Sequence, residues 1–210
     1  MVRGVLHEQE CAELIRALGP IHTAGERGLL GHPAVAQLAA SEPLKSLLKP
    51  HLSIEPLPIR AIYFDKTPVT NWLVAWHQDL TIALRERREI PGWGPWSVKV
   101  GIQHVQPPVE FLERMIAVRL HLDPCDETNG ALLVLTGSHR RGRLSAEDIE
   151  KFRTEHSAVL CRADVGDALL MRPLLLHSSR RSQSERHRRI LHIEYAGFEL
   201  PEQLAWNEAA

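Results

Sequence analysis

The sequence predicts a mainly β fold, an antiparallel sandwich or jelly roll preceded by helices, and two observations predict it. From residue 59 onward, short β-branched or apolar runs alternate with turn residues such as the Asn129-Gly130 pair, a pattern typical of jelly rolls. Before residue 59, apolar side chains recur at helical spacing instead. We therefore expect N-terminal helices followed by eight or nine brief strands.

Three helices are expected from local signals. Residues 8–18 have helical periodicity and end at Gly19, which stops a helix. Residues 33–49, which begin and end beside prolines, are expected to form a second helical stretch. Ser145 starts a capping pattern with an aspartate three residues later. It predicts a helix over 145–156 that is inserted between strands and covers one sheet edge.

The expected strands are the apolar runs that turn residues separate. They are Ile59–Phe64, Trp72–Trp76, Val98–His104, Met115–Leu122, Ala131–Leu135, Ala158–Cys161, Ala168–Met171, Leu174–His177 and Ile190–Tyr195. Residues 85–97 are charged and then rich in Gly, Pro and Trp, so a long loop is expected there. The whole chain, 1–210, is expected to be one domain, with 1–58 as helical support, 59–196 as the β core and 197–210 as a tail.

Composition excludes several classes of partner. The 25 basic and 26 acidic side chains nearly cancel, so neither nucleic acid nor an anionic membrane is an expected partner. The three cysteines include no CxxC pair, which fits a reducing cytoplasm better than secretion. No apolar stretch approaches the ~20 residues of a membrane span, and the N-terminus lacks a signal-peptide core. A cytoplasmic protein that acts on a small molecule is expected.

The strongest functional signal is a histidine followed two residues later by a carboxylate. The pattern occurs at His77 and Asp79, at His121 and Asp123, and at His192 and Glu194. Side chains at i and i+2 share one face of a strand in all three. His192 has no later histidine to complete a site, and His121 is expected to be a hydrogen-bonded interior residue. His77 and Asp79 follow an apolar run directly, as paired ligands at a barrel mouth should.

His177 is the expected third ligand, because it ends a buried apolar run and precedes polar residues. His187 lies among basic residues and is expected to be solvated. Two imidazoles and one carboxylate are the ligands of the facial triad that holds non-haem Fe(II) and leaves coordination positions open. The residues therefore indicate a redox enzyme.

An arginine near the last strand completes the pattern. Strand alternation places Arg188 and Arg189 on opposite faces, so only one of them can point into the barrel. A buried guanidinium requires an anionic partner, and the distal carboxylate of a diacid fits its planar fork of donors.

These residues resemble the phytanoyl-CoA dioxygenase-like family of Fe(II)/2-oxoglutarate-dependent oxygenases, over about residues 60 to 196. The resemblance rests on Trp76-His77-Gln78-Asp79, on Asp123 to Gly130 leading into Ala131 to Arg140, and on His177 with Arg188 eleven residues later. Thr136 stands where the family usually has proline. That departure concerns a turn and not a metal ligand.

The resemblance implies a double-stranded β-helix and assigns the residues. His77, Asp79 and His177 would be the iron ligands and the catalytic centre. Arg188, rather than Arg189, would bind the 5-carboxylate of 2-oxoglutarate, and Ser179 would assist it. The implied function is an O2-consuming dioxygenase that hydroxylates a small-molecule substrate and releases succinate and CO2. Because Asp79 is present, hydroxylation is preferred over halogenation.

The substrate residues and two rival functions stay open at this point. Candidates for the cavity wall are Lys99, Gln103, Arg119 and His121, with Trp93 and Trp96 in a segment, residues 85–111, that overhangs the mouth as a lid or anchors itself to the body. One rival is a cupin-type metal-dependent isomerase or hydrolase that uses His121 and Asp123. The other is a non-catalytic ligand-binding β-sandwich with structural histidines. A diacid clamp at Arg188 would argue against the first rival, and stoichiometric uptake of Fe(II) would argue against the second.

Overall fold

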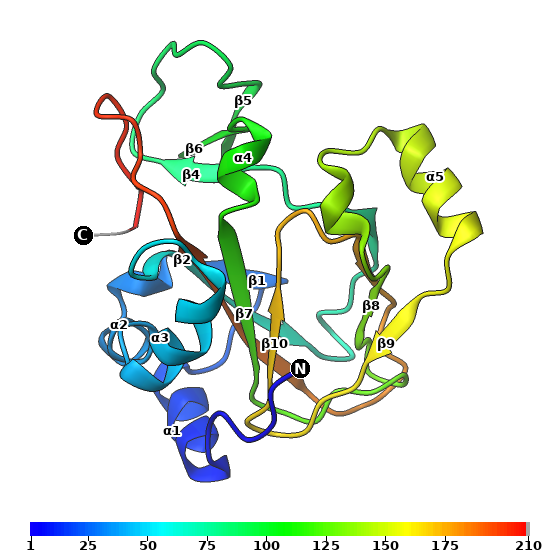
Figure 1. The fold of residues 1–210 in the computed structure, drawn as a ribbon. Coiled ribbons are helices and arrows are strands. Elements are labelled where there is room, and N and C mark those ends of the chain that lie inside the picture. Colours follow the sequence, from blue (N-terminus) through cyan, green and yellow to red (C-terminus); the bar gives the residue numbers. More distant parts are fainter. Residues whose placement is uncertain (209–210) are drawn as a thin grey trace.

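The structure, a computed structural model, describes residues 1–208 and arranges their strands in three antiparallel sheets (Figure 1). The strands are β1 (Gly25–Arg27), β2 (Leu57–Lys66), β3 (Val74–His77), β4 (Ile82–Leu84), β5 (Trp96–Lys99), β6 (Ile102–Val105), β7 (Met115–His121), β8 (Leu132–Val134), β9 (Val159–Cys161), β10 (Ala168–Met171), β11 (His177–Ser179) and β12 (Arg188–Ala196). The α-helices are α1 (Glu8–Leu18), α2 (Pro33–Ala39), α3 (Glu42–Leu48), α4 (Val109–Leu112) and α5 (Ala146–Glu155). Helices therefore come first and strands dominate the rest, as predicted.

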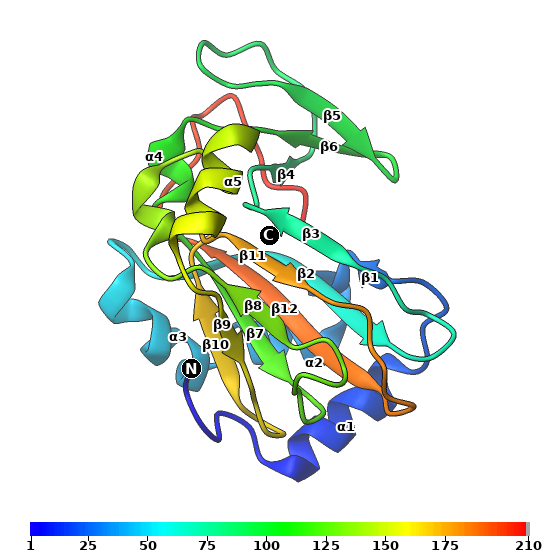
Figure 2. The ribbon, with the colours of Figure 1, turned by 90° about the vertical axis from the view of Figure 1, so that its right-hand side faces the viewer.

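Two of the sheets form the barrel. The major sheet has the order β1-β2-β12-β7-β10, and the minor sheet has the order β3-β11-β8-β9. Figure 2 shows the minor-sheet strands lying over those of the major sheet. Neighbours within each sheet come from distant parts of the sequence, so the chain passes repeatedly between the two sheets. This is the double-stranded β-helix, and the predicted fold class is confirmed.

The N-terminal helices cover the outer face of the major sheet (Figure 1). Alternation along β12 explains why they pack there: Leu191, Ile193 and Tyr195 belong to the hydrophobic core that includes the helices. The Tyr195 hydroxyl donates a hydrogen bond to the Ala39 carbonyl, at 3.0 Å. The opposite face of β12, which begins with Arg188, is left to line the barrel interior.

Two predicted elements are divided in the structure. The helical stretch 33–49 is two helices, α2 and α3, because Ser41 is extended and Pro43 falls in the first turn of a new helix. The run Val98–His104 is a hairpin of β5 and β6, since Val100 and Gly101 adopt positive φ angles of 51° and 78°. Two such residues make a tight hairpin turn, and a β-branched residue in this conformation gives no sequence signal of it.

The third sheet, β4-β6-β5, projects beyond one end of the barrel (Figures 1 and 2). Its first strand, β4, and the neighbouring helix α4 were not predicted. Trp93 is buried here, with its ring centroid 5.0 Å from that of Phe111. Phe198 and Trp206, from the segment after β12, join the same hydrophobic cluster. Trp93 therefore anchors the segment to the body.

The inserted helix α5 lies beside the minor sheet (Figure 1). It begins with the predicted capping box, in which the Asp148 backbone N–H donates to Ser145 Oγ, at 3.1 Å, and the Ser145 backbone N–H donates to the Asp148 carboxylate, at 3.3 Å. Phe152 fastens the helix by packing against Leu135 and Leu176. No helix within residues 1–208 combines the length and apolar character needed to cross a bilayer.

Candidate metal centre

Adjacent strands of the minor sheet place the two histidines side by side. His77 and His177 are direct register partners of β3 and β11, and their ring centroids lie 4.2 Å apart. Asp79 follows β3, and its backbone N–H donates to the Pro173 carbonyl, at 2.8 Å. Between the ligands, the buried Gln78 side chain points elsewhere, where its amide donates to two carbonyls and accepts the Leu144 N–H. Gln78 thereby fixes the turn that carries Asp79.

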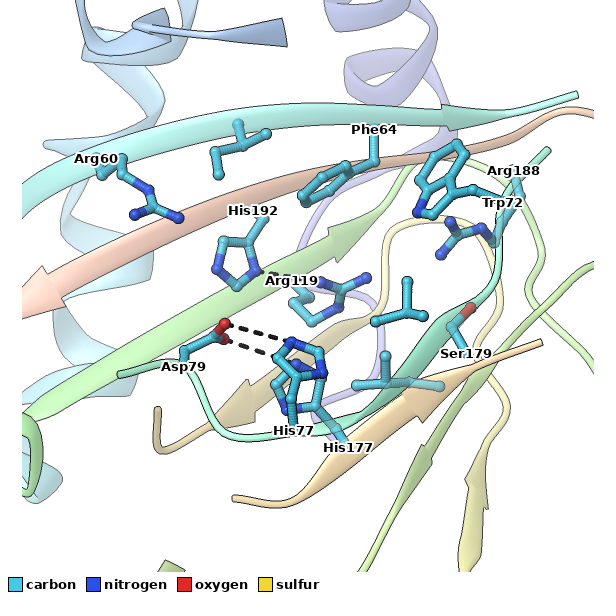
Figure 3. Close-up of a pocket in the computed structure, with 13 residues that line it drawn as sticks. Arg60, Phe64, Trp72, His77, Asp79, Arg119, His177, Ser179, Arg188 and His192 are labelled. Atoms are coloured by element: carbon cyan, nitrogen blue, oxygen red, sulfur yellow. Dashed lines mark hydrogen bonds and ion pairs between the residues drawn. The ribbon is translucent and has the colours of Figure 1, made fainter. Parts of the chain in front are cut away.

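The three side chains converge on one point (Figure 3). Asp79 Oδ1 lies 3.6 Å from His77 Nε2, and Asp79 Oδ2 lies 3.7 Å from His177 Nε2. One potential ligand atom from each residue lies within 4.8 Å of the other two. Among residues 1–208, this is the only such group of three metal-binding side chains.

Backbone carbonyls set the tautomer of both imidazoles. His77 Nδ1 lies 2.8 Å from the Ala75 carbonyl, and His177 Nδ1 lies 2.8 Å from the Leu175 carbonyl. Because a carbonyl oxygen only accepts, each Nδ1 carries the hydrogen and each Nε2 keeps a free lone pair. Metal-binding histidines are commonly oriented by such contacts. Both Nε2 atoms are therefore ready to bind a cation.

The protonation states also suit a cation. Burial lowers the pKa of His177 to about 4, so this imidazole is neutral at neutral pH. Burial acts to raise the pKa of Asp79, but the hydrogen bond with His77 outweighs it and holds the pKa well below its usual range. Burial acts to lower the pKa of His77, and Asp79 reverses that shift. An anionic carboxylate beside two imidazoles remains.

The other two histidine and carboxylate pairs do not form such a cluster. Asp123 binds the Arg189 guanidinium with both oxygens, at 2.7 Å each. His121 is buried, burial lowers its pKa to about 3, and neither ring nitrogen has a partner among residues 1–208. Glu194 pairs with Arg60, at 3.1 Å.

A small cavity of about 110 Å³ lies between the two sheets. It connects the His77, Asp79 and His177 group, called the metal cluster below, with Arg119 and Arg188. Its lining is formed by Arg60, Ile62, Phe64, Trp72, Val74, His77, Asp79, Arg119, Leu132, His177, Ser179, Arg188 and His192. Six of these were singled out from the sequence as metal, cosubstrate or wall residues. The structure thus brings the predicted metal and cosubstrate residues into one cavity.

Arg188 lies at the end of this cavity away from Asp79 (Figure 3). It is only 2% exposed, and its Nε has no hydrogen-bond partner among residues 1–208. Burial lowers its pKa, but a guanidinium stays charged in proteins. Arg189 turns the other way and forms its ion pair with Asp123. Of the two arginines, Arg188 is the one that points inward, where it has an unpaired charge.

Ser179 belongs to a network that includes a lysine missed by the sequence analysis. The Ser179 hydroxyl donates to the Gly130 carbonyl, at 2.8 Å, and accepts from Lys66 Nζ, at 2.6 Å. Lys66 is fully buried, and it is the register partner of Arg188 where β2 lies beside β12. Burial and, to a smaller extent, the charge of Arg188 lower the Lys66 pKa to about 7. A Cβ at Gly130 would lie 2.6 Å from the Arg180 carbonyl, so glycine is required there.

A polar row on the major sheet was not predicted from the sequence. Arg119 Nη1 lies 3.3 Å from His192 Nδ1. His192 Nε2 lies 3.4 Å from Glu194 Oε1, which in turn pairs with Arg60. The alternation of β2 contains a signal for Arg60 and Lys66, which stand on one face of that strand with the cavity residues Ile62 and Phe64.

The remaining candidates lie outside the cavity lining. Lys99 is exposed on β5 and contacts Thr81 Oγ1, at 3.4 Å. Gln103 lies on β6, and His121 is enclosed in the barrel. Trp93 and Trp96 pack in or against the hydrophobic cluster beneath the third sheet. Of the proposed substrate residues, Arg119 alone lines the cavity.

Several solved structures share this fold. EctD from S. alaskensis in its apoform has a TM-score of 0.69 at 20% identity, with 98% of this chain and 78% of that chain covered. HygX from Streptomyces hygroscopicus, solved with nickel and 2-oxoglutarate bound, has a TM-score of 0.64 at 17% identity, with 93% of this chain and 80% of that chain covered. SnoN, a non-heme alpha ketoglutarate dependent epimerase from nogalamycin biosynthesis, has a TM-score of 0.63 at 16% identity, with 92% of this chain and 75% of that chain covered. At these identities the likeness shows the fold.

Comparison with curated proteins gives no match. The family description Phytanoyl-CoA dioxygenase (PhyH), in contrast, matches residues 1–190, which is most of the chain. The matched residues include His77, Asp79, His177 and Arg188, and every residue of the cavity lining except His192. The chain therefore belongs to the phytanoyl-CoA dioxygenase family.

Proposed function

We propose that this protein is an Fe(II)- and 2-oxoglutarate-dependent dioxygenase that hydroxylates a small molecule and releases succinate and CO2. The observation that carries the proposal is the presence of the His77, Asp79 and His177 cluster and of the unpaired Arg188 in one cavity. The similar structure HygX, with nickel and 2-oxoglutarate bound, supports it.

The cluster fits Fe(II) by its donor set. Two imidazoles and one carboxylate, on one side of a site with open space opposite, are the facial arrangement of non-haem Fe(II) oxygenases. His77 and His177 supply Nε2 atoms whose tautomers are already fixed, and Asp79 supplies the negative charge. These three residues would hold the metal.

Arg188 fits the far end of 2-oxoglutarate. Its Nε is a buried donor that has no partner in the described part of the chain, and a carboxylate is the anion that a guanidinium binds through two parallel hydrogen bonds. Ser179 lines the same end of the cavity. A compact diacid suits the end of the cavity that Arg188 and Ser179 line.

The residues position the reactants, and the bound groups supply the oxidation. When bound, iron and 2-oxoglutarate use dioxygen to oxidise a substrate carbon, with decarboxylation of the cosubstrate to succinate. His77, His177 and Asp79 fix the metal on the minor-sheet wall, and Arg188 fixes the cosubstrate from the major-sheet wall. Ile62, Val74 and Leu132 give the cavity apolar walls, which strengthen these electrostatic contacts by excluding water.

Hydroxylation is proposed from the residues and not from the fold, since SnoN carries the same fold and is an epimerase. Asp79 occupies the carboxylate position of the triad. Product analysis by mass spectrometry distinguishes the outcomes, because hydroxylation adds one oxygen atom and epimerisation adds none.

Iron uptake and cosubstrate turnover test the proposal. Protein purified without oxygen is expected to bind one Fe(II) and, once oxygen is admitted, to form succinate from 2-oxoglutarate in an iron-dependent way. Asp79→Ala is expected to lose both properties, whereas Asp164→Ala, at an exposed carboxylate, keeps them. Wild-type protein that takes up no stoichiometric Fe(II) would contradict the proposal.

A further inference from the structure

The cavity contains a second buried guanidinium with an unused donor. Arg119, on β7, is 8% exposed and lines the cavity together with Arg188. Its Nη1 contacts His192, but its Nε is buried and has no hydrogen-bond partner among residues 1–208. Figure 3 shows Arg119 and His192 across the cavity from the metal cluster. A donor of this kind calls for an acceptor that a ligand would bring.

The unused Nε lies on the edge of the guanidinium that binds carboxylates elsewhere in this chain. Arg189 holds Asp123 through Nε and Nη2, at 2.7 Å each. Arg162 holds Glu127 through the same two atoms, at 2.9 Å each. The edge formed by Nε and Nη2 matches the spacing of two carboxylate oxygens. In Arg119, Nε of this edge has no protein acceptor, while Nη1 is occupied.

The neighbours of Arg119 do not neutralise its charge. A guanidinium only donates, so His192 Nδ1 accepts from Arg119, and the ring hydrogen is on Nε2, toward Glu194. His192 is then neutral. Glu194 has its own cation, Arg60, at 3.1 Å. The row therefore leaves one positive charge at Arg119, which packs over the ring of Phe64 with its Cζ 5.8 Å from the centroid.

The proposed metal and cosubstrate do not balance this charge either. The two charges of Fe(II) and that of Arg188 are offset by Asp79 and by the two carboxylates of 2-oxoglutarate. Lys66 lies outside the cavity lining, and burial lowers its pKa to about 7. A buried guanidinium without a counter-ion is strongly unfavourable. An additional anionic group is therefore expected in the assembled site.

We propose that Arg119 binds a carboxylate of the primary substrate, so that the enzyme acts on a small organic acid. This inference rests on the proposed function, because the charge balance assumes that iron and 2-oxoglutarate are bound. The anchored acid would lie against Phe64, which supplies apolar surface beside Arg119.

Matched acids and amides test the proposal with protein that holds Fe(II) and saturating 2-oxoglutarate without oxygen. The probes are butyrate with butyramide and phenylacetate with phenylacetamide, and their affinities are measured by calorimetry. The wild type is expected to bind each acid at least about tenfold more tightly than its amide. Arg119→Gln is expected to abolish that preference and to leave the affinity for 2-oxoglutarate unchanged. Arg140→Gln, at an exposed arginine, serves as the control and keeps the preference.

Each other outcome has a distinct meaning. Wild-type protein that binds Fe(II) and 2-oxoglutarate but does not prefer acids to amides overturns the inference and leaves the proposed function standing. Wild-type protein that does not bind 2-oxoglutarate overturns the proposed function itself. Arg119→Gln protein that loses affinity for 2-oxoglutarate assigns Arg119 to the cosubstrate and also overturns the inference.

A second variant covers the case in which Arg119→Gln does not fold. Arg119→Lys keeps the charge but loses the planar fork, so it is expected to retain part of the preference for acids. An acid preference equal to that of the wild type would contradict a bidentate site at Arg119.

Discussion

The two walls of the cavity are built in opposite ways. The minor-sheet wall carries short side chains, the two imidazoles and Asp79, and backbone carbonyls fix the orientation of both imidazoles. The major-sheet wall carries long cations, Arg119 and Arg188, whose Nε donors are buried and have no partner among residues 1–208. The first wall is preorganised for a cation. The second has positive charge that only anionic ligands would neutralise.

Burial has a different result on each wall. It lowers the pKa of His177 to about 4, which keeps an uncharged ligand available to a metal. Behind the other wall, burial lowers the pKa of Lys66 to about 7, so that one cation is partly discharged next to Arg188. Arginines cannot discharge in this way. Two cationic sites therefore persist where ligand carboxylates are expected.

The largest expected effect is on metal binding at the minor-sheet wall. Asp79→Ala removes the only carboxylate of the cluster, and we expect Fe(II) affinity to fall by at least about 100-fold, beyond the range seen when residues around metal ligands are changed. Iron content after anaerobic loading measures this. Retention of stoichiometric iron by Asp79→Ala would show that the cluster is not the metal site.

On the major-sheet wall, Arg188→Met is expected to weaken 2-oxoglutarate binding by about 100-fold, because truncating one partner of a buried charge pair costs about 2–5 kcal/mol. Fe(II) affinity should not change. The matched control is Arg189→Met, next in sequence but paired with Asp123, which should leave both affinities intact. Equal losses in the two variants would contradict separate roles for the walls.

Lys66→Met tests the burial of a lysine next to Arg188 through the pH dependence of stability. The Lys66 pKa is lowered from 10.5 to about 7, so between these values the unfolded chain binds more protons than the folded one. The lysine therefore makes stability rise with pH, by up to about 1.4 kcal/mol per unit. Lys66→Met should remove this contribution, with its largest relative gain at or below pH 7.

Denaturant unfolding at several pH values measures the Lys66→Met effect, with Lys99→Met, at an exposed lysine, as the control. If wild type and Lys66→Met show the same change in unfolding free energy from pH 7 to pH 10, the burial of a charged lysine is refuted as a source of the dependence.

The smallest effect is expected outside both walls. Ser145→Ala removes the cap of α5 and should cost about 1 kcal/mol of stability. Binding of Fe(II) and 2-oxoglutarate should be unaffected, because α5 is not part of the cavity lining. Thr154→Ala in the same helix should cost less. Weakened 2-oxoglutarate binding in Ser145→Ala would extend the site beyond the two walls.

The residues of the minor-sheet wall were easier to predict from the sequence than those of the major-sheet wall. His77 and Asp79 follow an apolar run and His177 ends one, and short side chains at strand ends point where the backbone directs them. Strand alternation alone left Arg188 and Arg189 open, and the family resemblance favoured Arg188; the register of β12 with its neighbours then placed Arg188 inward. The row of Arg119, His192 and Glu194 depends on contacts between strands that lie far apart in the sequence. Local patterns do not contain such contacts.

We expect one cavity to hold both a metal, at His77, Asp79 and His177, and a diacid whose far carboxylate lies on Arg188. The most direct test of this expectation is an anaerobic titration of the Fe(II)-loaded protein with 2-oxoglutarate, followed by the absorption band of the Fe(II) and 2-oxoglutarate complex. The account predicts a band that saturates at one 2-oxoglutarate per protein and needs far more ligand in Arg188→Met. A wild-type protein that binds Fe(II) but develops no such band would contradict it.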